Sequence, residues 1–436
     1  MPLSSDAKEW ALQILPKLPP ELCDSVVDHL HDDKPTLKVC TLVCKAWLPS
    51  STIHLFSSFS WPPCHHVWET RVLTSADDFD CRCGTEKSNF EHLLMLLTVT
   101  PRVTSAVSCL RLSSLRLSQP PFFHLSLSTL YAIIDCLPYL RVIEFADCSL
   151  QQDVVLRPDD SRMRDDLEVR FRPLFRNSQL WMHDAFNIIP ALSPLGKLYI
   201  GATMFNRLDA GRTPVPPVGS QRARVTALET RWEIAHCVKH LFHCLQLYVD
   251  FSSIRTLRLR GPICDRTGNF LSFFPSTIEE LTYHVSDVSP SIPHCSQLRS
   301  VTVIGSIIAG PNGPSEWSDI VRDLHAVPTC NIHGLCVTLQ VFEDPGWTDN
   351  AAPVDLPFYH LHRTLTNQDW MHFARCLERF LSLQSIQLKM ELQPVHHRPG
   401  KLSEDIPRCI RILREVTSGY LSNALAAITS VQCRCR

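Results

Sequence analysis

A short pattern of apolar and polar positions recurs along the chain after about residue 90. It reads L-x-x-L-x-L, with Ile, Val, Phe or Tyr also filling the apolar positions. Its apolar residues alternate with their neighbours, as they do in a half-buried β-strand. The pattern occurs as Val107/Leu110/Leu112, Leu140/Ile143/Phe145, Leu195/Leu198/Ile200, Ile254/Leu257/Leu259, Ile278/Leu281/Tyr283, Leu298/Val301/Val303, Ile332/Leu335/Val337 and Leu383/Ile386/Leu388.

Helix-like segments precede several of these strands, such as Thr129–Leu137 before Leu140 and Trp370–Phe380 before Leu383. A helix followed by a strand, many times over, predicts a leucine-rich-repeat-like solenoid. Successive matches are 24 and 20 residues apart between Ile254 and Val303, but 33 to 59 residues apart elsewhere. Regular repeats run about 20–29 residues, so the central stretch carries the signal. The outer matches are also compatible with chance in a chain of this composition.

Charged or Gly- and Pro-rich stretches separate the predicted strands. Because such stretches favour turns and loops, we expect loops at residues 157–173, 207–224, 309–316 and 343–357. The segment from Ser403 to Ser430 is expected to form one or two helices. A short tail ending in Cys433-Arg-Cys435-Arg follows it.

Residues 18–48 carry the most ordered local pattern. Prolines 19 and 20 fit the first turn of a helix, whose amides have no intrahelical partner. Leu22, Val26 and Leu30 then follow at four-residue steps, and Val27 widens this apolar face. A second apolar face is formed by Leu37, Cys40, Cys44 and Trp47, with Val39 and Val43 beside it. Two or three helices this short cannot cover faces this wide, so the module must pack on the rest of the chain or on a partner.

This segment, LPPELCDSVVDHLHDDKPTLKVCTLVCKAWLPSS, resembles the F-box. The match is residue by residue at Leu18, Pro19, Glu21, Leu22, Val43, Cys44, Lys45 and Trp47. Pro35, at the start of the second helix, departs from the usual pattern. The resemblance implies docking onto a Skp adaptor, and through it onto a cullin and a RING subunit. The adaptor-binding residues that it implies are Leu18, Pro19, Leu22, Val26, Leu30, Leu37, Val43 and Trp47. The alternative is a plain helical hairpin that packs on its own chain.

The predicted fold class is α/β, with a small helical F-box module followed by an irregular leucine-rich-repeat-like solenoid. The F-box module is expected at residues 14–56. An aromatic, Pro-rich connector that packs on the body is expected at 57–100. The substrate-binding body follows at 101–400, and a C-terminal helical segment with a tail at 401–436.

The composition is that of an ordinary globular protein, with 44% hydrophobic and 20% charged residues and a net charge of -2. This balance gives no reason to expect a nucleic-acid or membrane partner. The N-terminus lacks the apolar run of a secretory signal, and no stretch reaches the roughly 18 apolar residues of a membrane span. We therefore expect a soluble protein of the cytoplasm or nucleus.

The 19 cysteines are scattered among apolar neighbours, which favours reduced thiols acting as small core residues. Cys81-x-Cys83 near His92, and Cys433-x-Cys435, do not have the spacing of paired zinc ligands. The adjacent pairs His65-His66 and His396-His397 are interpreted as solvated loop residues. No metal and no cofactor is expected.

Motifs of catalysis are also missing from the sequence. It contains no G-x-G-x-x-G, no phosphate-binding G-x-x-x-x-G-K-[ST], no G-x-S-x-G and no H-E-x-x-H. Four arginines, Arg255, Arg258, Arg260 and Arg299, alternate with apolar residues on candidate strands and should face outward. They form either a patch for an acidic or phosphorylated segment or an ordinary solvated strand face.

The leading hypothesis is a non-catalytic substrate receptor of a Skp–cullin–F-box ubiquitin ligase. In this hypothesis the module binds the adaptor and the body binds a protein target that the sequence does not identify. A protein-interaction scaffold that delivers no target is the alternative, and an enzyme without a recognised motif is a third possibility.

Overall fold

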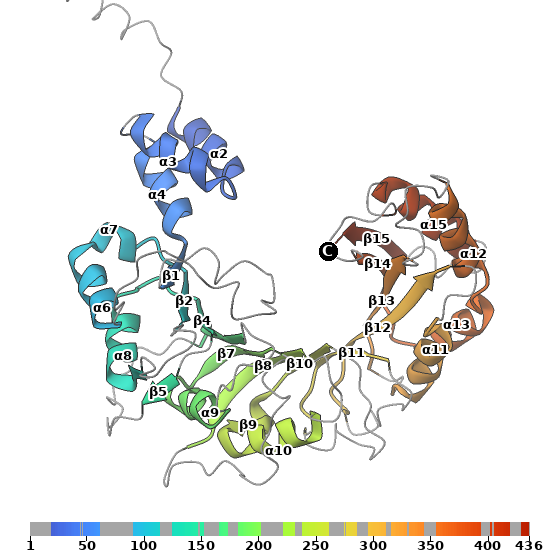
Figure 1. The fold of residues 1–436 in the computed structure, drawn as a ribbon. Helices are drawn as coiled ribbons and strands as arrows, with labels where there is room; N and C mark the ends of the chain where they lie inside the picture. Colours follow the sequence, from blue (N-terminus) through green and yellow to red (C-terminus); the bar gives the residue numbers. More distant parts are fainter. Residues whose placement is uncertain are drawn as a thin grey trace, which may run out of the picture. The chain divides into compact units, whose positions relative to one another are not determined.

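The computed structural model describes residues 19–43, 45, 47–61, 90–113, 124–146, 149–151, 165–172, 182–201, 221–231, 238–260, 274, 276–285, 295–310, 315–328, 331–343, 355–393, 402, 405–418 and 429–435 (Figure 1). The chain divides into two compact units. Residues 1–71 and 75–156 form the first unit, and residues 72–74 and 157–436 form the second.

The first unit combines short helices with short parallel strands. Its helices are α2 (Pro20–His29), α3 (Lys34–Val43), α4 (Leu48–Phe56), α6 (Phe90–Val99), α7 (Pro101–Thr104) and α8 (Leu127–Asp135). The strands β1 (Ser58–Trp61), β2 (Cys109–Ser113) and β4 (Val142–Ala146) pair in parallel in that order. A separate parallel pair is formed by β3 (His124–Ser126) and β5 (Ser149–Gln151).

The second unit contains a long parallel sheet. Its strands are β6 (Glu168–Arg172), β7 (Leu195–Ile200), β8 (Ala223–Arg231), β10 (Thr256–Arg260), β11 (Glu280–His284), β12 (Ser300–Ala309), β13 (Gly334–Glu343), β14 (Ser385–Gln393) and β15 (Thr429–Cys435). Each of these strands pairs in parallel with the one that follows it in this series. The two-residue strand β9 (Val249–Asp250) pairs with the start of β8.

The helices of the second unit lie along one face of this sheet (Figure 1). They are α9 (Met182–Ala191), α10 (Val238–Tyr248), α11 (Trp317–Ala326), α12 (Leu356–Thr366), α13 (Trp370–Leu377) and α15 (Ile406–Ser418), with a short 3-10 turn, η4 (Phe251–Ser253). The opposite face, here called the open face, carries no helix of the described residues. Parallel strands joined by helices are the arrangement of α/β proteins, so the α/β part of the predicted fold class is confirmed.

The strand register aligns the apolar triplets that the sequence suggested. Leu257 pairs with Leu281, Leu281 with Val301, Val301 with Leu335 and Leu335 with Ile386. All five side chains are buried. The eight predicted triplets each fall on a strand or at its start, and the helices expected at Thr129–Leu137 and Trp370–Phe380 correspond to α8 and α13.

Three segments differ from the expectation. Residues 157–173 were expected as a loop, but Glu168–Arg172 form β6, because Val169 and Phe171 point inward between outward-facing charged residues. The expected loop at 207–224 ends in the first residues of β8. The C-terminal segment contains the expected helix, α15, but its tail forms a strand, β15, paired with β14. Within the stretch expected as a connector, residues 57–100, the structure contains the strand β1 and the helix α6.

Candidate functional site

The helices α2 and α3 begin at residues that favour the first turn of a helix. α2 begins at Pro20, with Glu21 in its first turn, where a carboxylate interacts favourably with the helix dipole. Before α3, the carboxylate of Asp33 accepts hydrogen bonds from the Thr36 amide at 3.1 Å and the Thr36 hydroxyl at 2.6 Å. These bonds lower the pKa of Asp33. Pro35 lies in the first turn of α3, where it sacrifices no hydrogen bond.

Two polar links hold α2 against α4. The Ser50 hydroxyl donates to Oδ1 of Asp24, and Nε2 of His54 lies 2.7 Å from Oδ1 of Asp28. The linked residues are four positions apart on each helix, so they lie on matching faces one turn apart. Beneath these links, the module buries a small set of side chains: Cys23, Val27, Leu37, Cys40 and Ser51.

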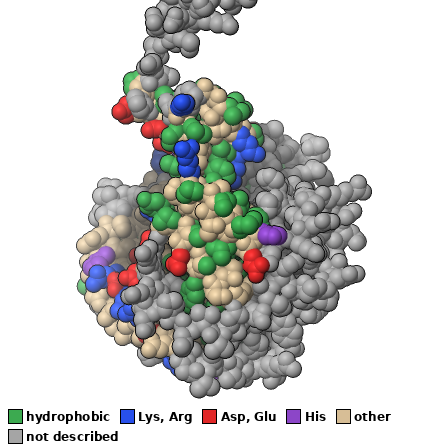
Figure 2. Space-filling view, turned by 90° about the vertical axis from the view of Figure 1, so that its left-hand side faces the viewer, with side chains coloured by type: hydrophobic (Ala, Val, Ile, Leu, Met, Phe, Trp, Pro, Cys, Tyr) green, Lys and Arg blue, Asp and Glu red, His purple; other side chains and the backbone are tan. Residues whose placement is uncertain are grey.

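The same helices leave many apolar side chains at the surface. Of 13 large apolar side chains exposed in the described residues, seven belong to this module: Leu22, Val26, Val39, Leu42, Val43, Leu48 and Ile53. Leu22 is 52% exposed, Val43 59% and Leu42 84%. Figure 2 shows apolar side chains at the surface of the first unit, including its upper part, where α2–α4 lie. Single exposed apolar residues are ordinary, but such a concentration on three short helices is typical of a binding surface.

The predicted adaptor-binding residues occupy three environments in the structure. Pro19, Leu22, Val26 and Val43 are exposed, while Leu30 and Trp47 are half-buried. Leu37 is fully buried between the helices, so it can support the surface but does not lie on it. Leu18 and Cys44 lie outside the described residues. The prediction did not include Leu42 or Ile53, although both are exposed on α3 and α4.

The four arginines singled out in the sequence separate into two pairs. Arg258 and Arg260 are on β10 and face the open side of the sheet, because they alternate with Leu257 and Leu259, which point into the core. Arg255 and Arg299 instead precede β10 and β12, at the edge where the strands begin. Nε of Arg255 lies 3.8 Å from Oε1 of Glu279 at this edge. The structure therefore does not bring the four guanidinium groups together in one patch.

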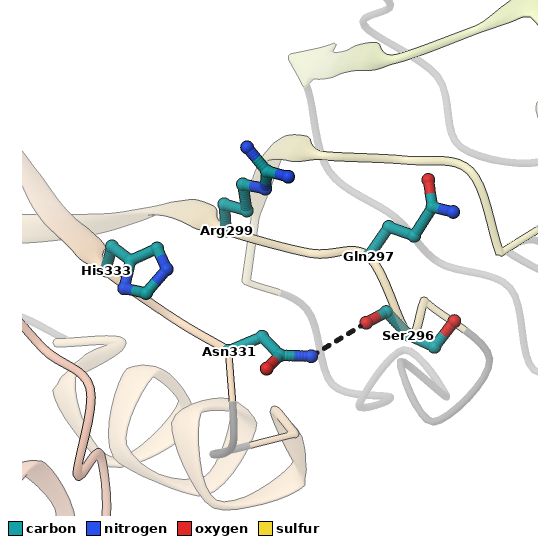
Figure 3. A pocket seen from close by; sticks show the side chains of 5 residues that line it. All are labelled: Ser296, Gln297, Arg299, Asn331 and His333. Carbon is teal, nitrogen blue, oxygen red and sulfur yellow. Dashed lines mark hydrogen bonds between the residues drawn. The ribbon is translucent and has the colours of Figure 1, made fainter.

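A polar hollow of about 430 Å³ lies at the same edge, before β12 and β13 (Figure 3). Its lining residues are Ser296, Gln297, Arg299, Asn331 and His333. The Asn331 side chain donates to the Ser296 carbonyl at 3.0 Å, and Nδ1 of His333 lies 3.1 Å from the Ser382 carbonyl. All five lining residues are exposed, so solvent screens any charge that enters. The hollow therefore has the chemistry of solvated loop ends, with one arginine and two side-chain amides.

The described cysteines are mostly core residues. Cys23, Cys40, Cys244, Cys295, Cys336, Cys376 and Cys409 are buried. Burial raises the pKa of the Cys244 thiol to about 11 and also raises the pKa values of Cys295 and Cys376. Such thiols stay protonated and are poor nucleophiles.

Metal ligands do not converge within the part of the chain that the structure describes. No group of three or more His, Cys, Asp or Glu side chains there could hold a metal ion. Cys81 and Cys83, and both adjacent histidine pairs, lie outside this part, while His92 is exposed on α6. Cys433 and Cys435 are in β15.

Comparison with protein-family models and with curated proteins found no match for this chain. A search of the described helices for a membrane span was also negative, since none combines the necessary length with the necessary apolar character.

Proposed function

We propose that this chain is the substrate-receptor subunit of a Skp–cullin–F-box ubiquitin ligase. The observation that carries the proposal is the apolar surface of α2–α4, formed by seven exposed side chains on helices whose residues resemble the F-box. Fully burying a Leu or Val side chain contributes roughly 1.5–3 kcal/mol. Several such side chains together can hold a helical partner protein.

In this proposal the second unit is the target-binding body, an irregular leucine-rich-repeat-like solenoid. Two features support it. The strands from β6 to β8 and from β10 to β15 pair in the order of the sequence, and helices along one face connect many of them. Solenoids built this way leave one face of the sheet available for a partner.

The mechanism is positional. The adaptor and cullin bring a charged ubiquitin-conjugating enzyme close to the target that the body holds. The gain is the effective concentration of a target lysine, and no side chain of this chain takes part in bond making.

The adaptor interface can be tested by co-expression with a Skp adaptor and capture of the complex. We expect Leu22→Asp with Val26→Asp to abolish co-purification, because both side chains are exposed and would place charge in an apolar interface. The matched control is Tyr359→Asp with Met371→Asp, which changes exposed apolar residues of α12 and α13. Capture of the α2 variant at the level of the control would contradict the proposal.

A scaffold that binds the adaptor but delivers nothing would pass this capture test. Receptor function is therefore tested separately, by identifying proteins that co-purify with the second unit and measuring their turnover in cells. A substrate receptor predicts that turnover slows when Leu22→Asp with Val26→Asp breaks adaptor binding. Turnover that is independent of these residues would favour the scaffold.

A further inference from the structure

The open face of the second unit carries an excess of positive charge on its first strands. On β6 to β11 this face holds six cations, Arg170, Arg172, Lys197, Arg231, Arg258 and Arg260. It holds three carboxylates, Glu168, Glu229 and Glu280. The whole chain has a net charge of -2, so this excess is a property of the face and not of the composition.

Two of the three carboxylates are already neutralised by neighbours. Oε1 and Oε2 of Glu229 lie 3.0 Å from Nε of Arg260 and 2.9 Å from Nζ of Lys197. Glu168 lies 2.9 Å from Nε of Arg170 and 3.2 Å from Nζ of Lys197. The Glu229 side chain is only 9% exposed, whereas Lys197 and Arg260 are about three times more exposed, at 27% and 29%. The side chains of this network that are accessible to solvent are therefore mainly its cations.

Arg258 is a cation of the open face that takes no part in these ion pairs. It lies directly opposite Glu229 on one side and Thr282 on the other. Because both oxygens of Glu229 bind Lys197 and Arg260, Arg258 makes no ion pair or hydrogen bond with any residue that the structure describes. Arg258 as a whole is half-buried, and its side chain lies on the open face of the sheet, where its donors can reach an incoming ligand.

Arg231 is a second cation of the open face that takes no part in these ion pairs. It lies two residues after Glu229 on β8. It is the register partner of Arg260 on the neighbouring strand, so two guanidinium groups are adjacent on one face. Arg231 is exposed and, within the described ranges, also has no ion-pair partner. Like charges directly opposite each other on a sheet are destabilising, and a bound anion would offset that repulsion.

The excess of positive charge does not extend over the whole open face of the sheet. In the row that contains Arg258, the positions on β12, β13 and β14 are Thr302, Cys336 and Gln387. Lys389 is a cation on the same face of β14, four strands away from β10, and supplies an internal comparison. We call Lys197, Arg231, Arg258 and Arg260 the basic strip.

We propose that the basic strip binds an acidic segment of a partner polypeptide, through its Asp and Glu carboxylates. Guanidinium groups bind carboxylates through paired, charge-assisted hydrogen bonds. Arg231 and Arg258 pair with no residue that the structure describes, so their donors are available for such bonds. A nucleic acid fits less well, because the basic strip covers only three neighbouring strands of a chain that is negative overall. The proposal rests on the proposed function in that the acidic segment belongs to the target that the second unit holds.

The test measures fluorescence anisotropy of a labelled (Glu-Ser)6 peptide with the full chain at low salt, beside a (Gln-Ser)6 peptide. We expect binding of the glutamate peptide only, weakening as salt is added. Arg231→Ala with Arg258→Ala should weaken it at least fivefold. Neither residue pairs with another residue in the described part of the chain, so we expect the fold to be retained. Lys389→Ala should change affinity less than twofold. Glu229→Gln should strengthen binding, because it removes the carboxylate that competes for Lys197 and Arg260.

Equal affinity of the double arginine variant and of Lys389→Ala would overturn the proposal. So would equal binding of the two peptides. Tighter binding of a (dT)12 oligonucleotide, or binding of a phosphoserine peptide but not of the glutamate peptide, would assign the strip to a different ligand. The assay contains no adaptor and the substitutions lie outside α2–α4, so its outcome is independent of adaptor capture.

Discussion

Nε2 of His54 lies 2.7 Å from Oδ1 of Asp28 and joins α4 to α2 across 26 residues of sequence. The Ser50–Asp24 bond makes a second link one turn earlier. These bonds lie on the side of α2 that is turned toward α4. Cys23 and Val27 are buried, while Leu22 and Val26 are at the surface.

His54→Ala should therefore loosen α2 without unfolding the second unit. Asp28 is 64% exposed, so solvent screens the pair and the expected loss is only about 0.5–1 kcal/mol. Hydrogen exchange of the α2 amides should become several-fold faster, and adaptor capture should weaken without disappearing. His29→Ala is the control, because the hydrogen bond of its ring to the Ser25 carbonyl stays within α2. Identical exchange in the two variants would show that the link does not hold α2.

The second unit depends on an aromatic cluster between α11 and α13. Trp370 is fully buried, its ring centroid lies 4.3 Å from that of Trp317, and its Nε1 donates to the Leu365 carbonyl at 2.7 Å. Trp370→Ala should destabilise this unit by roughly 3–5 kcal/mol through the cavity it leaves. Urea denaturation followed by tryptophan fluorescence measures the loss, with the exposed neighbour Met371→Ala as control. Adaptor capture at low temperature should survive, and its loss would mean that the two units are not independent.

The buried thiol of Cys244 should resist alkylation. With its pKa raised to about 11 by burial, its thiolate fraction at pH 8 is about 0.1%, against about 10% at the ordinary value of 9.0. Iodoacetamide should therefore leave Cys244 unmodified in the folded chain and modify it in urea, as read by peptide mass spectrometry. The half-buried Cys136 should react sooner. Rapid labelling of Cys244 under native conditions would show that α10 does not pack as described.

A histidine pair links α11 to α13 in a pH-sensitive way. Arg379 can only donate, so its Nη1, 2.6 Å from Nδ1 of His325, fixes the proton of neutral His325 on Nε2. That Nε2–H then donates to Nε2 of His372 at 3.1 Å. Burial, followed by the charges of Arg379 and His372, lowers the pKa of His325 below 6.5.

The direction of the pH effect follows from that shift. The unfolded chain takes up a proton at His325 more readily than the folded chain, so folding stability rises with pH through this range. The contribution is complete above pH 6.5 and is lost as the pH falls through the folded pKa. The thermal midpoint should drop between pH 7.5 and 5.5 by more in the wild type than in His325→Gln. His92→Gln, on α6, should behave like the wild type. An equal decrease of the thermal midpoint in His325→Gln and in the wild type would show that His325 does not contribute to the pH dependence of stability.

Eight strands could be predicted because one face of each is apolar and the other is mostly polar. The triplets at Leu257 and Leu281 show this plainly, because their period of two is unbroken. β6 was missed because its polar face, Glu168 and Arg170, is so strongly charged that the segment is typical of a loop. β8 was missed because the buried residue that completes its triplet is Thr230.

The sequence also predicts that α2 and α3 carry more apolar residues than a small helical hairpin can bury. It does not predict which of these residues face inward and which face solvent. The stripe through Leu22 and Val26 is adjacent to Cys23 and Val27, and either half could face inward on periodicity alone. The choice depends on contacts with α4, which are distant in sequence. Leu42 carried a usable signal, since it is three residues after Val39 on the same exposed side of α3.

Adaptor binding is measured most simply by calorimetric titration of a purified Skp adaptor into the 436-residue chain. We expect 1:1 binding with a negative heat-capacity change, because the apolar side chains of α2–α4 become buried. Leu22→Asp with Val26→Asp should abolish the binding heat, while Tyr359→Asp with Met371→Asp should leave it unchanged. Absence of binding by a chain that is folded by circular dichroism would contradict the proposed function and assign the exposed apolar residues to another partner.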